Sequence, residues 1–235
     1  MDLGAVVGVT LLAALATPLG GAFALQLGQT KGRFGQSLLR TIVAVGGGLL
    51  FAAVALVLVP EGLRGLPLGP ALSFFVGGAV FFLLLDKGLA QRGDRVSQVL
   101  ANTLDSVPTS LGLGAAFAAG GAAAPALVVL VALQNLPEGF NGYRELNEAG
   151  LSRAGTFGVL TLTSLLGPLV AAVGYLWLGG HPAFVAGLFL VAAGGILYIL
   201  VQDIAPLAHR DGHWAPALGA VFGFAVGITA KVLVA

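Results

Sequence analysis

The sequence contains no cysteine and very little charge. The absence of cysteine excludes disulfide bonds, thiolate metal sites and thiol catalysis. Only 9% of the 235 residues are charged, 11 Lys or Arg and 10 Asp or Glu, whereas about a quarter of the residues of a soluble domain carry charge. The formal net charge of +1 gives no indication of nucleic-acid binding. The composition therefore argues against a soluble globular domain and against a nucleic-acid partner.

Long apolar runs take up most of the chain, and 57% of its residues are hydrophobic. A transmembrane helix needs about 20 mainly apolar residues, and polar residues or Pro and Gly divide this chain into eight such segments. We therefore predict an all-α polytopic membrane protein, with residues 1–235 forming a single transmembrane domain. No basic segment precedes the first run, so we expect a span there and not a cleaved signal. The predicted spans are residues 4–27, 37–59, 69–90, 96–119, 123–143, 154–178, 182–205 and 214–235.

The basic residues are distributed unequally between the two sets of connections. Nine Lys or Arg residues lie in or beside the odd-numbered connections, and two lie beside the even-numbered ones. Because cytoplasmic loops are rich in Lys and Arg, we expect a protein of the inner (cytoplasmic) membrane with both termini outside. The nine are Lys31, Arg33, Arg40, Lys87, Arg92, Arg95, Arg144, Arg153 and Arg210, and the two are Arg64 and Lys231.

Polar residues surround a proline in two consecutive predicted spans. The stretches Thr103–Ser110 and Ala132–Gly139 match each other at an offset of 29 residues, and they lie on spans of opposite direction. Proline removes a backbone donor and disturbs the helix, so we expect helix breaks at Pro108 and Pro137, with the carbonyls of Leu104 and Leu133 freed. Paired Pro-interrupted segments of inverted topology are typical of a transport site.

The acids in these stretches predict a cation site. Residues four apart share a helix face, which places Asp105 near Thr109 and Gln134 near Glu138, with Ser106 and Asn135 one step round. A carboxylate at the centre of a bilayer costs about 3 kcal/mol on insertion scales, and no Lys or Arg lies at mid-span to neutralise the two acids. A divalent cation would neutralise them. Two alternatives remain: the acids are protonated, or hydroxyl and amide donors hold them in a structural network.

These residues resemble those of the ZIP (Zrt/Irt-like) divalent metal transporters, and most closely the bacterial GufA-type branch. The segment Gln134-Asn135-Leu136-Pro137-Glu138-Gly139 matches the family's motif in span five, Gln-Asn-x-Pro-Glu-Gly. Ser164–Leu169, Asp203–His213 and Leu83–Lys87 are similar to its segments in spans six, seven and three. The resemblance implies eight spans, an inverted-repeat bundle of 3+2+3 helices, outside termini and a metal site between spans four and five.

The departures from the family pattern imply one metal site where the family has two. Asp105 stands where the family has His, Ser106 where it has Asn, Thr109 where it has a metal-binding Glu, and Gly167 where many members have a bridging Glu. The remaining ligands offer oxygen without imidazole or thiolate, and such sets suit Mn²⁺, Mg²⁺ or Ca²⁺ better than Zn²⁺. The expected metal ligands are Asp105, Gln134, Asn135, Glu138, Thr109 and Ser106.

A second group of polar residues lies at the predicted cytoplasmic ends of spans three and seven. Asp86, Gln202, Asp203 and His209 could form an exit route for the ion, and His213 lies one turn after His209. Solvation of helix ends and contact with lipid headgroups is the alternative explanation.

The sequence therefore predicts a carrier that moves a divalent metal ion, such as Zn²⁺, Mn²⁺ or Fe²⁺, toward the cytoplasm by alternating access. The expected partners are the divalent ion, which is the substrate, and membrane lipid. No enzymatic activity is expected because the sequence contains no enzyme motif. The alternative is a non-transporting relative that acts as a membrane scaffold or metal sensor. A third candidate, an intramembrane hydrolase, is disfavoured because the sequence offers no plausible pair of nucleophile and base. The oligomeric state stays open, a homodimer included.

Overall fold

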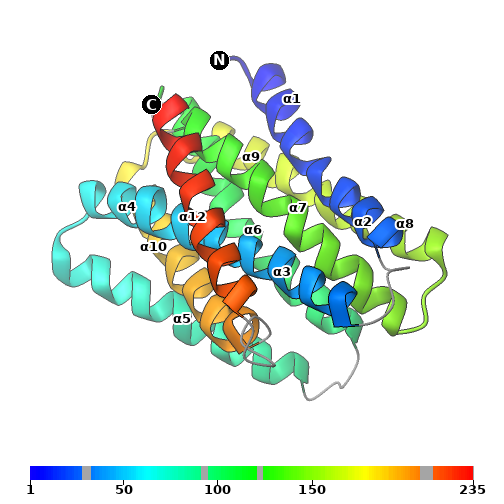
Figure 1. The fold of residues 1–235 in the computed structure, drawn as a ribbon. Helices are drawn as coiled ribbons and strands as arrows, with labels where there is room; N and C mark the ends of the chain where they lie inside the picture. The colour runs from blue at the N-terminus through cyan, green and yellow to red at the C-terminus, as the bar shows by residue number, and fades with distance from the viewer. Residues whose placement is uncertain (28–32, 91–94, 121–123, 207–213, 235) are drawn as a thin grey trace.

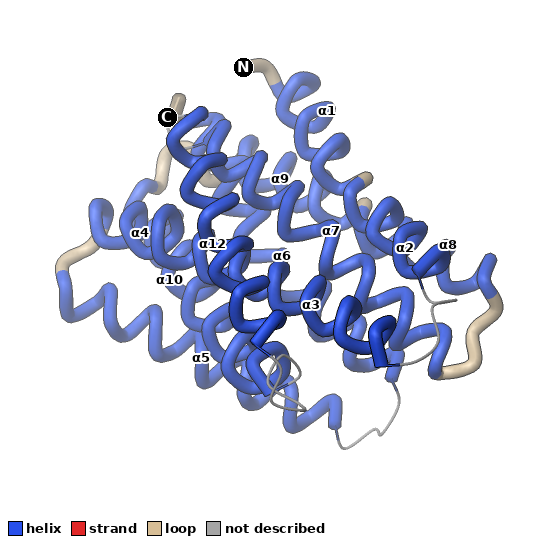
Figure 2. Tube along the Cα trace, in the orientation of Figure 1, coloured by secondary structure: helices blue, strands red, loops and turns tan. Residues whose placement is uncertain are grey.

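A computed structural model describes residues 1–27, 33–90, 95–120, 124–206 and 214–234 of the chain. In these ranges the regular structure is helical throughout, and strands are absent (Figure 2). The helices are α1 (Leu3–Ala14), α2 (Ala16–Leu27), α3 (Arg33–Ala53), α4 (Val59–Gly65), α5 (Leu68–Ala90), α6 (Arg95–Ala118), α7 (Ala124–Glu148), α8 (Arg153–Ser164), α9 (Leu166–Trp177), α10 (Pro182–Ile199) and α12 (Trp214–Val234), with π-helical segments η1 (Val54–Leu58) and η2 (Leu200–Ile204).

Six stretches of the described chain are helical, long and apolar enough to cross a membrane. They correspond to six of the eight predicted spans, and the protein is therefore an all-α protein with the character of a membrane protein. They are Leu3–Leu27, Ser37–Gly65, Leu68–Gly88, Arg153–Trp177, Pro182–Gln202 and Trp214–Leu233.

The fourth and fifth predicted spans are helices of 24 and 25 residues, α6 and α7, which are more polar than the six. Both lie within the bundle (Figure 1). Helix α7 packs against α1, α2, α3, α6, α8 and α12, and α6 packs against α5, α7, α8, α9 and α10. Surrounding helices therefore cover these two, which lets them carry polar side chains away from lipid.

The helix breaks expected at Pro108 and Pro137 do not occur, because α6 and α7 continue through both prolines. The first and sixth spans are interrupted instead, at Leu15 between α1 and α2 and at Leu165 between α8 and α9. Each interruption comes three residues before a proline, Pro18 or Pro168. An internal proline removes one helical hydrogen bond and need not end the helix.

Two predicted helix ends are also displaced. The fifth span continues five residues beyond 143, to Glu148, and its end is closed by a hydrogen bond from the Leu151 N–H to the Leu146 carbonyl (3.1 Å) around Gly150, whose φ is +89°. This is the glycine-dependent helix ending that positive φ allows. The second span continues through Pro60 to Gly65, because Pro60 lies in the first turn of α4, where its missing N–H has little effect.

The two interrupted spans cross each other in opposite directions beside α6 and α7. Helix α1 packs against α9, and α2 packs against α8, so the interruption at Leu15 lies at the same level as that at Leu165. Both chain ends lie at the same end of the bundle (Figure 1). The crossing places both interruptions, at Leu15 and Leu165, next to the polar residues of α6 and α7. These two interruptions are called the bends below.

Candidate functional site

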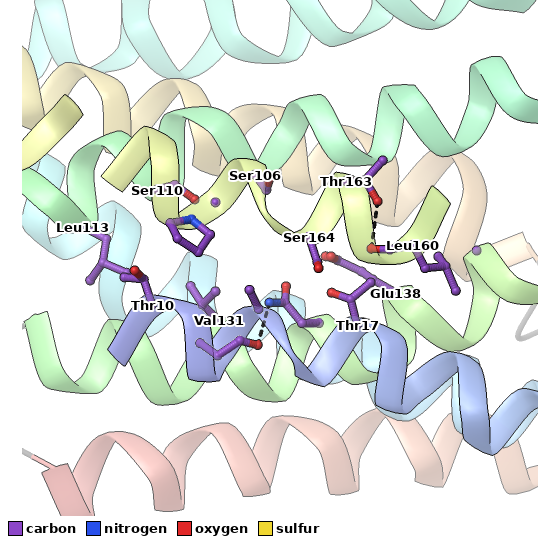
Figure 3. Close-up of a pocket in the computed structure, with 16 residues that line it drawn as sticks. Thr10, Thr17, Ser106, Ser110, Leu113, Val131, Glu138, Leu160, Thr163 and Ser164 are labelled. Atoms are coloured by element: carbon purple, nitrogen blue, oxygen red, sulfur yellow. Dashed lines mark hydrogen bonds between the residues drawn. The ribbon is translucent and has the colours of Figure 1, made fainter. Parts of the chain in front are cut away.

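A cavity of about 70 Å³ lies where the two bends meet α6 and α7. This volume holds several water-sized groups. The cavity is distinctly polar for the interior of such an apolar chain, and its lining comes from α1, α2, α6, α7, α8 and α9 (Figure 3). Its polar lining residues are Thr10, Thr17, Ser106, Ser110, Asn135, Glu138, Thr163 and Ser164.

Glu138 supplies a carboxylate to this cavity from α7. Its side chain is held by Gln134, one turn earlier, whose Nε2 donates to Glu138 Oε1 over 2.8 Å. Gln134 is itself only 4% exposed and does not line the cavity. The two residues share a helix face as predicted. Gln134 was expected to be a metal ligand, but in the structure it holds the carboxylate of Glu138 in position.

Asn135 lines the cavity next to Glu138 and is fixed by a contact with the first span. Its Nδ2 donates to the carbonyl of Ala13 on α1 over 3.0 Å. This bond uses one of the two amide N–H donors of Asn135, and its carbonyl oxygen can act as an acceptor in the cavity. Gln134 thus donates to the carboxylate of the site, whereas Asn135 donates to the backbone of the first span.

The predicted ligands of α6 are divided by the structure. Ser106 lines the cavity, together with Ser110 one turn later. Thr109 does not line it: its side chain is buried, and its Oγ1 has no hydrogen-bond partner among the described residues. The side chain of Asp105 lies outside the described part of the chain.

Four hydroxyl residues from the bent spans complete the lining, and the sequence analysis did not identify them. Thr10 and Thr17 come from the first span, and Thr163 and Ser164 from the sixth. They are isolated polar residues in apolar runs, so no local pattern marks them. Prolines near the middle of these two spans, Pro18 and Pro168, were the available signal.

The protons of three of these four hydroxyls are directed into the helices. Thr10 Oγ1 donates to the Val6 carbonyl (2.8 Å), Thr163 Oγ1 to that of Val159 (2.9 Å) and Ser164 Oγ to that of Thr161 (2.8 Å). A hydroxyl has one proton and two acceptor lone pairs, so each presents lone pairs to other neighbours.

The bends contain two carbonyls that lose a helical donor to proline. Proline cannot donate the helical bond to the carbonyl four residues earlier, which concerns Ala14 before Pro18 and Ser164 before Pro168, and both residues line the cavity. The cavity contains a carboxylate, and three of its lining hydroxyls donate their protons to backbone carbonyls. Such a lining suits a cation better than an anion.

The predicted exit route is described only in part. Asp86 on α5 accepts a hydrogen bond from Tyr198 Oη on α10 (3.0 Å), which joins the third and seventh spans. Gln202 is exposed in η2. The side chain of Asp203, and His209 and His213 altogether, lie outside the described residues.

Among the described residues no group of three or more His, Asp or Glu is placed to hold a metal ion. Comparison with protein-family models and with curated proteins finds no match for this chain. The argument for function therefore depends on the cavity and on the motif that lines it.

Proposed function

We propose that the protein is a ZIP-like carrier that moves divalent metal ions across the membrane by alternating access. The observation that carries the proposal is the cavity in which Glu138, Asn135 and Ser106 meet between α6 and α7. These residues belong to the two stretches from which the sequence predicted the site. Their oxygens face a space large enough for a partly hydrated ion.

The pairing of the helices supports an eight-span bundle with a 3+2+3 inverted repeat. Helix α3 of the second span packs against α12 of the eighth, and α10 of the seventh packs against α5 of the third. Likewise α2 packs against α7, and α9 against α6. Exchanging spans one to three with spans six to eight, and span four with span five, converts the α3–α12 pair into the α10–α5 pair. The same exchange converts the α2–α7 pair into the α9–α6 pair.

Local irregularities occur at matching places in the two halves. The interruptions precede Pro18 in the first span and Pro168 in the sixth. The π-helical segments η1 and η2 end two residues before Pro60 and Pro206, in the second and seventh spans. Discontinuous helices at corresponding positions of inverted halves are typical of transporters that bind their substrate near the middle of the membrane.

In this proposal α6 and α7 cross the membrane with the six apolar helices, and both chain ends lie outside the inner membrane. The ion enters the cavity, is bound by oxygen atoms and leaves toward the basic, cytoplasmic face. One group of helices moves against the other while the ion stays near mid-membrane. Oxygen ligands favour Mn²⁺, Fe²⁺ or another divalent ion over Zn²⁺, and Asp105 would supply the second carboxylate.

Uptake of a panel of divalent ions into proteoliposomes tests this proposal. We expect saturable uptake by the native protein and its loss in Glu138→Ala. Glu148→Gln is the matched control, because Glu148 is an exposed acid at the end of the same helix, and it should transport as the native protein does. If well-folded native protein takes up no divalent ion, the carrier proposal is wrong, and a scaffold or sensor becomes the better explanation.

A further inference from the structure

Two hydroxyl residues from the bends lie beside Glu138, although neither belongs to the ligand set predicted from the sequence. Ser164 ends α8, and Thr17 lies in the first turn of α2. Both line the cavity, and Figure 3 shows them next to Glu138. The carboxylate of the fifth span is thus accompanied by hydroxyls from the first and sixth spans.

Ser164 can offer only an acceptor to the cavity. Its proton is used in the hydrogen bond to the Thr161 carbonyl, 2.8 Å away in the preceding turn. The lone pairs of Oγ then remain for a group inside the cavity. Two nearby residues of the same span, Leu162 and Leu165, are exposed. The span therefore turns Ser164 toward the cavity and apolar side chains toward lipid.

Thr17 is held close to Glu138 by backbone contact between α2 and α7. A Cβ added at Gly139, the residue after Glu138, would come within 1.9 Å of the Thr17 carbonyl oxygen, and one at Gly20 within 1.9 Å of the Leu136 carbonyl oxygen. The two helices therefore touch through their backbones at this level, and the side chains of Thr17 and Glu138 share one small space.

We propose that Ser164 and Thr17 are ligands of the transported cation, so that the site is built from the first and sixth spans as well as the fourth and fifth. This inference rests on the proposed function and adds to it a source of selectivity. Neutral hydroxyl oxygens beside a carboxylate suit hard cations with many oxygen ligands, such as Mn²⁺, Mg²⁺ or Ca²⁺. The bound ion also links α7 to both bends, so that its binding joins the helices which move.

Cysteine substitution tests the two hydroxyls directly. The native chain has no cysteine, so Ser164→Cys introduces a single thiol of similar shape, and Thr17→Cys does the same on the other bend. A thiolate ligand favours soft metals. We expect each variant to bind Cd²⁺ with the near-ultraviolet absorption of a sulfur–metal bond, and its affinity for Cd²⁺ relative to Mn²⁺ to rise by about tenfold or more over the native ratio.

Ser73→Cys is the matched control for the thiol. Ser73 Oγ also donates to the carbonyl of the preceding turn, that of Gly69 (3.1 Å), but it is exposed on α5 and far from the lining of the cavity in sequence and place. Its thiol should bind Cd²⁺ weakly. Adding Glu138→Ala should weaken Cd²⁺ binding by Ser164→Cys but leave Ser73→Cys unchanged, because only the first thiol shares its ion with the carboxylate.

The inference is overturned if both cavity thiols bind Cd²⁺ no more tightly than Ser73→Cys, or if their binding is independent of Glu138. That result would leave the carrier proposal intact when native uptake still depends on Glu138. Joint binding of Cd²⁺ by a cavity thiol and Glu138, in a protein that transports no ion, would instead support the ligand geometry and remove transport. If one variant does not fold, the other carries the same test.

Discussion

Gln134 donates a hydrogen bond to Glu138 across one turn of α7, with 2.8 Å between Nε2 and Oε1. The bond occupies one carboxylate oxygen of Glu138 and fixes the orientation of that carboxylate, while Gln134 itself stays outside the cavity. Both side chains lie within a helix that other helices surround. A neutral donor therefore holds the acid in place without neutralising it, which is the role that the proposed cation would take.

Replacement of Gln134 by leucine should weaken ion binding without abolishing transport. The substitution keeps the bulk of the side chain but removes the donor, and a hydrogen bond to a charged group contributes about 1.5–3 kcal/mol. We expect the KM for uptake to rise by about tenfold to a hundredfold, with a smaller change in maximal rate. Uptake kinetics in proteoliposomes measure both quantities.

The same substitution made on the Glu138→Ala background provides the control. If Gln134 acts only through the carboxylate, Gln134→Leu adds nothing further to the loss of ion binding in that background. An equal additional loss of binding would mean that Gln134 contacts the ion itself, as the sequence first suggested.

An acid placed at Gly167 should strengthen the site. Gly167 lines the cavity, and a Cβ added there would meet only Ser110 Oγ, at the ordinary contact distance of 3.5 Å. Gly167→Asp would bring a second carboxylate near Glu138, and additional carboxylate charge raises affinity for divalent cations. We expect tighter binding of Mn²⁺ by titration calorimetry together with slower turnover, because a tightly held ion leaves slowly.

Gly167→Ala separates charge from volume in that experiment. The alanine occupies the same space without charge and should leave Mn²⁺ affinity close to the native value. Unchanged affinity in Gly167→Asp, in a folded protein, would contradict a cation site in this cavity.

The helices could be predicted from the sequence far better than the site. Apolar runs bounded by polar residues gave the position of most helices to within a few residues, and only the ends of the second and fifth spans were displaced further, by five or six residues. The predicted positions of the helix interruptions were wrong. Breaks were predicted at Pro108 and Pro137 because polar residues surround them, whereas the interruptions precede Pro18 and Pro168, which lie in apolar surroundings. Whether a proline kinks a helix or interrupts it depends on the packing around it.

The site residues divide in the same way. Glu138 and Asn135 belong to a local motif, and both line the cavity. Thr17 and Ser164 reach it only because the first and sixth spans cross there, which no short stretch of sequence records. Thr109 has the spacing of a ligand but turns away from the cavity, since the lining face of α6 is the one that carries Ser106 and Ser110.

Substitution of Gly139 by alanine should destabilise the protein. The new methyl group would lie 1.9 Å from the Thr17 carbonyl oxygen, and the nearby atoms are backbone that cannot turn aside. Overpacking of this kind costs about 1–3 kcal/mol, so we expect a lower Tm in detergent and a reduced uptake rate because α2 is pushed away from Glu138.

Gly8→Ala is the matched control for this change. Gly8 lies in α1 with nothing within 4 Å of an added Cβ, so its replacement should leave uptake unchanged and the Tm equal or slightly higher, because alanine favours a helix. A Tm of Gly139→Ala equal to that of Gly8→Ala would show that α2 and α7 are farther apart than the structure places them.

Thr109 and Ser106 separate a ligand spacing from a cavity geometry, because the sequence predicts both as metal ligands and the structure places only Ser106 at the cavity. Thr109 Oγ1 is buried without a hydrogen-bond partner among the described residues, so Thr109→Val removes an unsatisfied polar atom and keeps the shape. Such a change is neutral or stabilising. We therefore expect native uptake and a Tm that is equal or higher. Ser106→Ala removes an oxygen from the cavity lining and should raise the KM for the divalent ion. If Thr109→Val impairs uptake as much as Ser106→Ala does, Thr109 must turn toward the ion in another conformation of the transport cycle, and the ligand set predicted from the sequence would be the better description of α6.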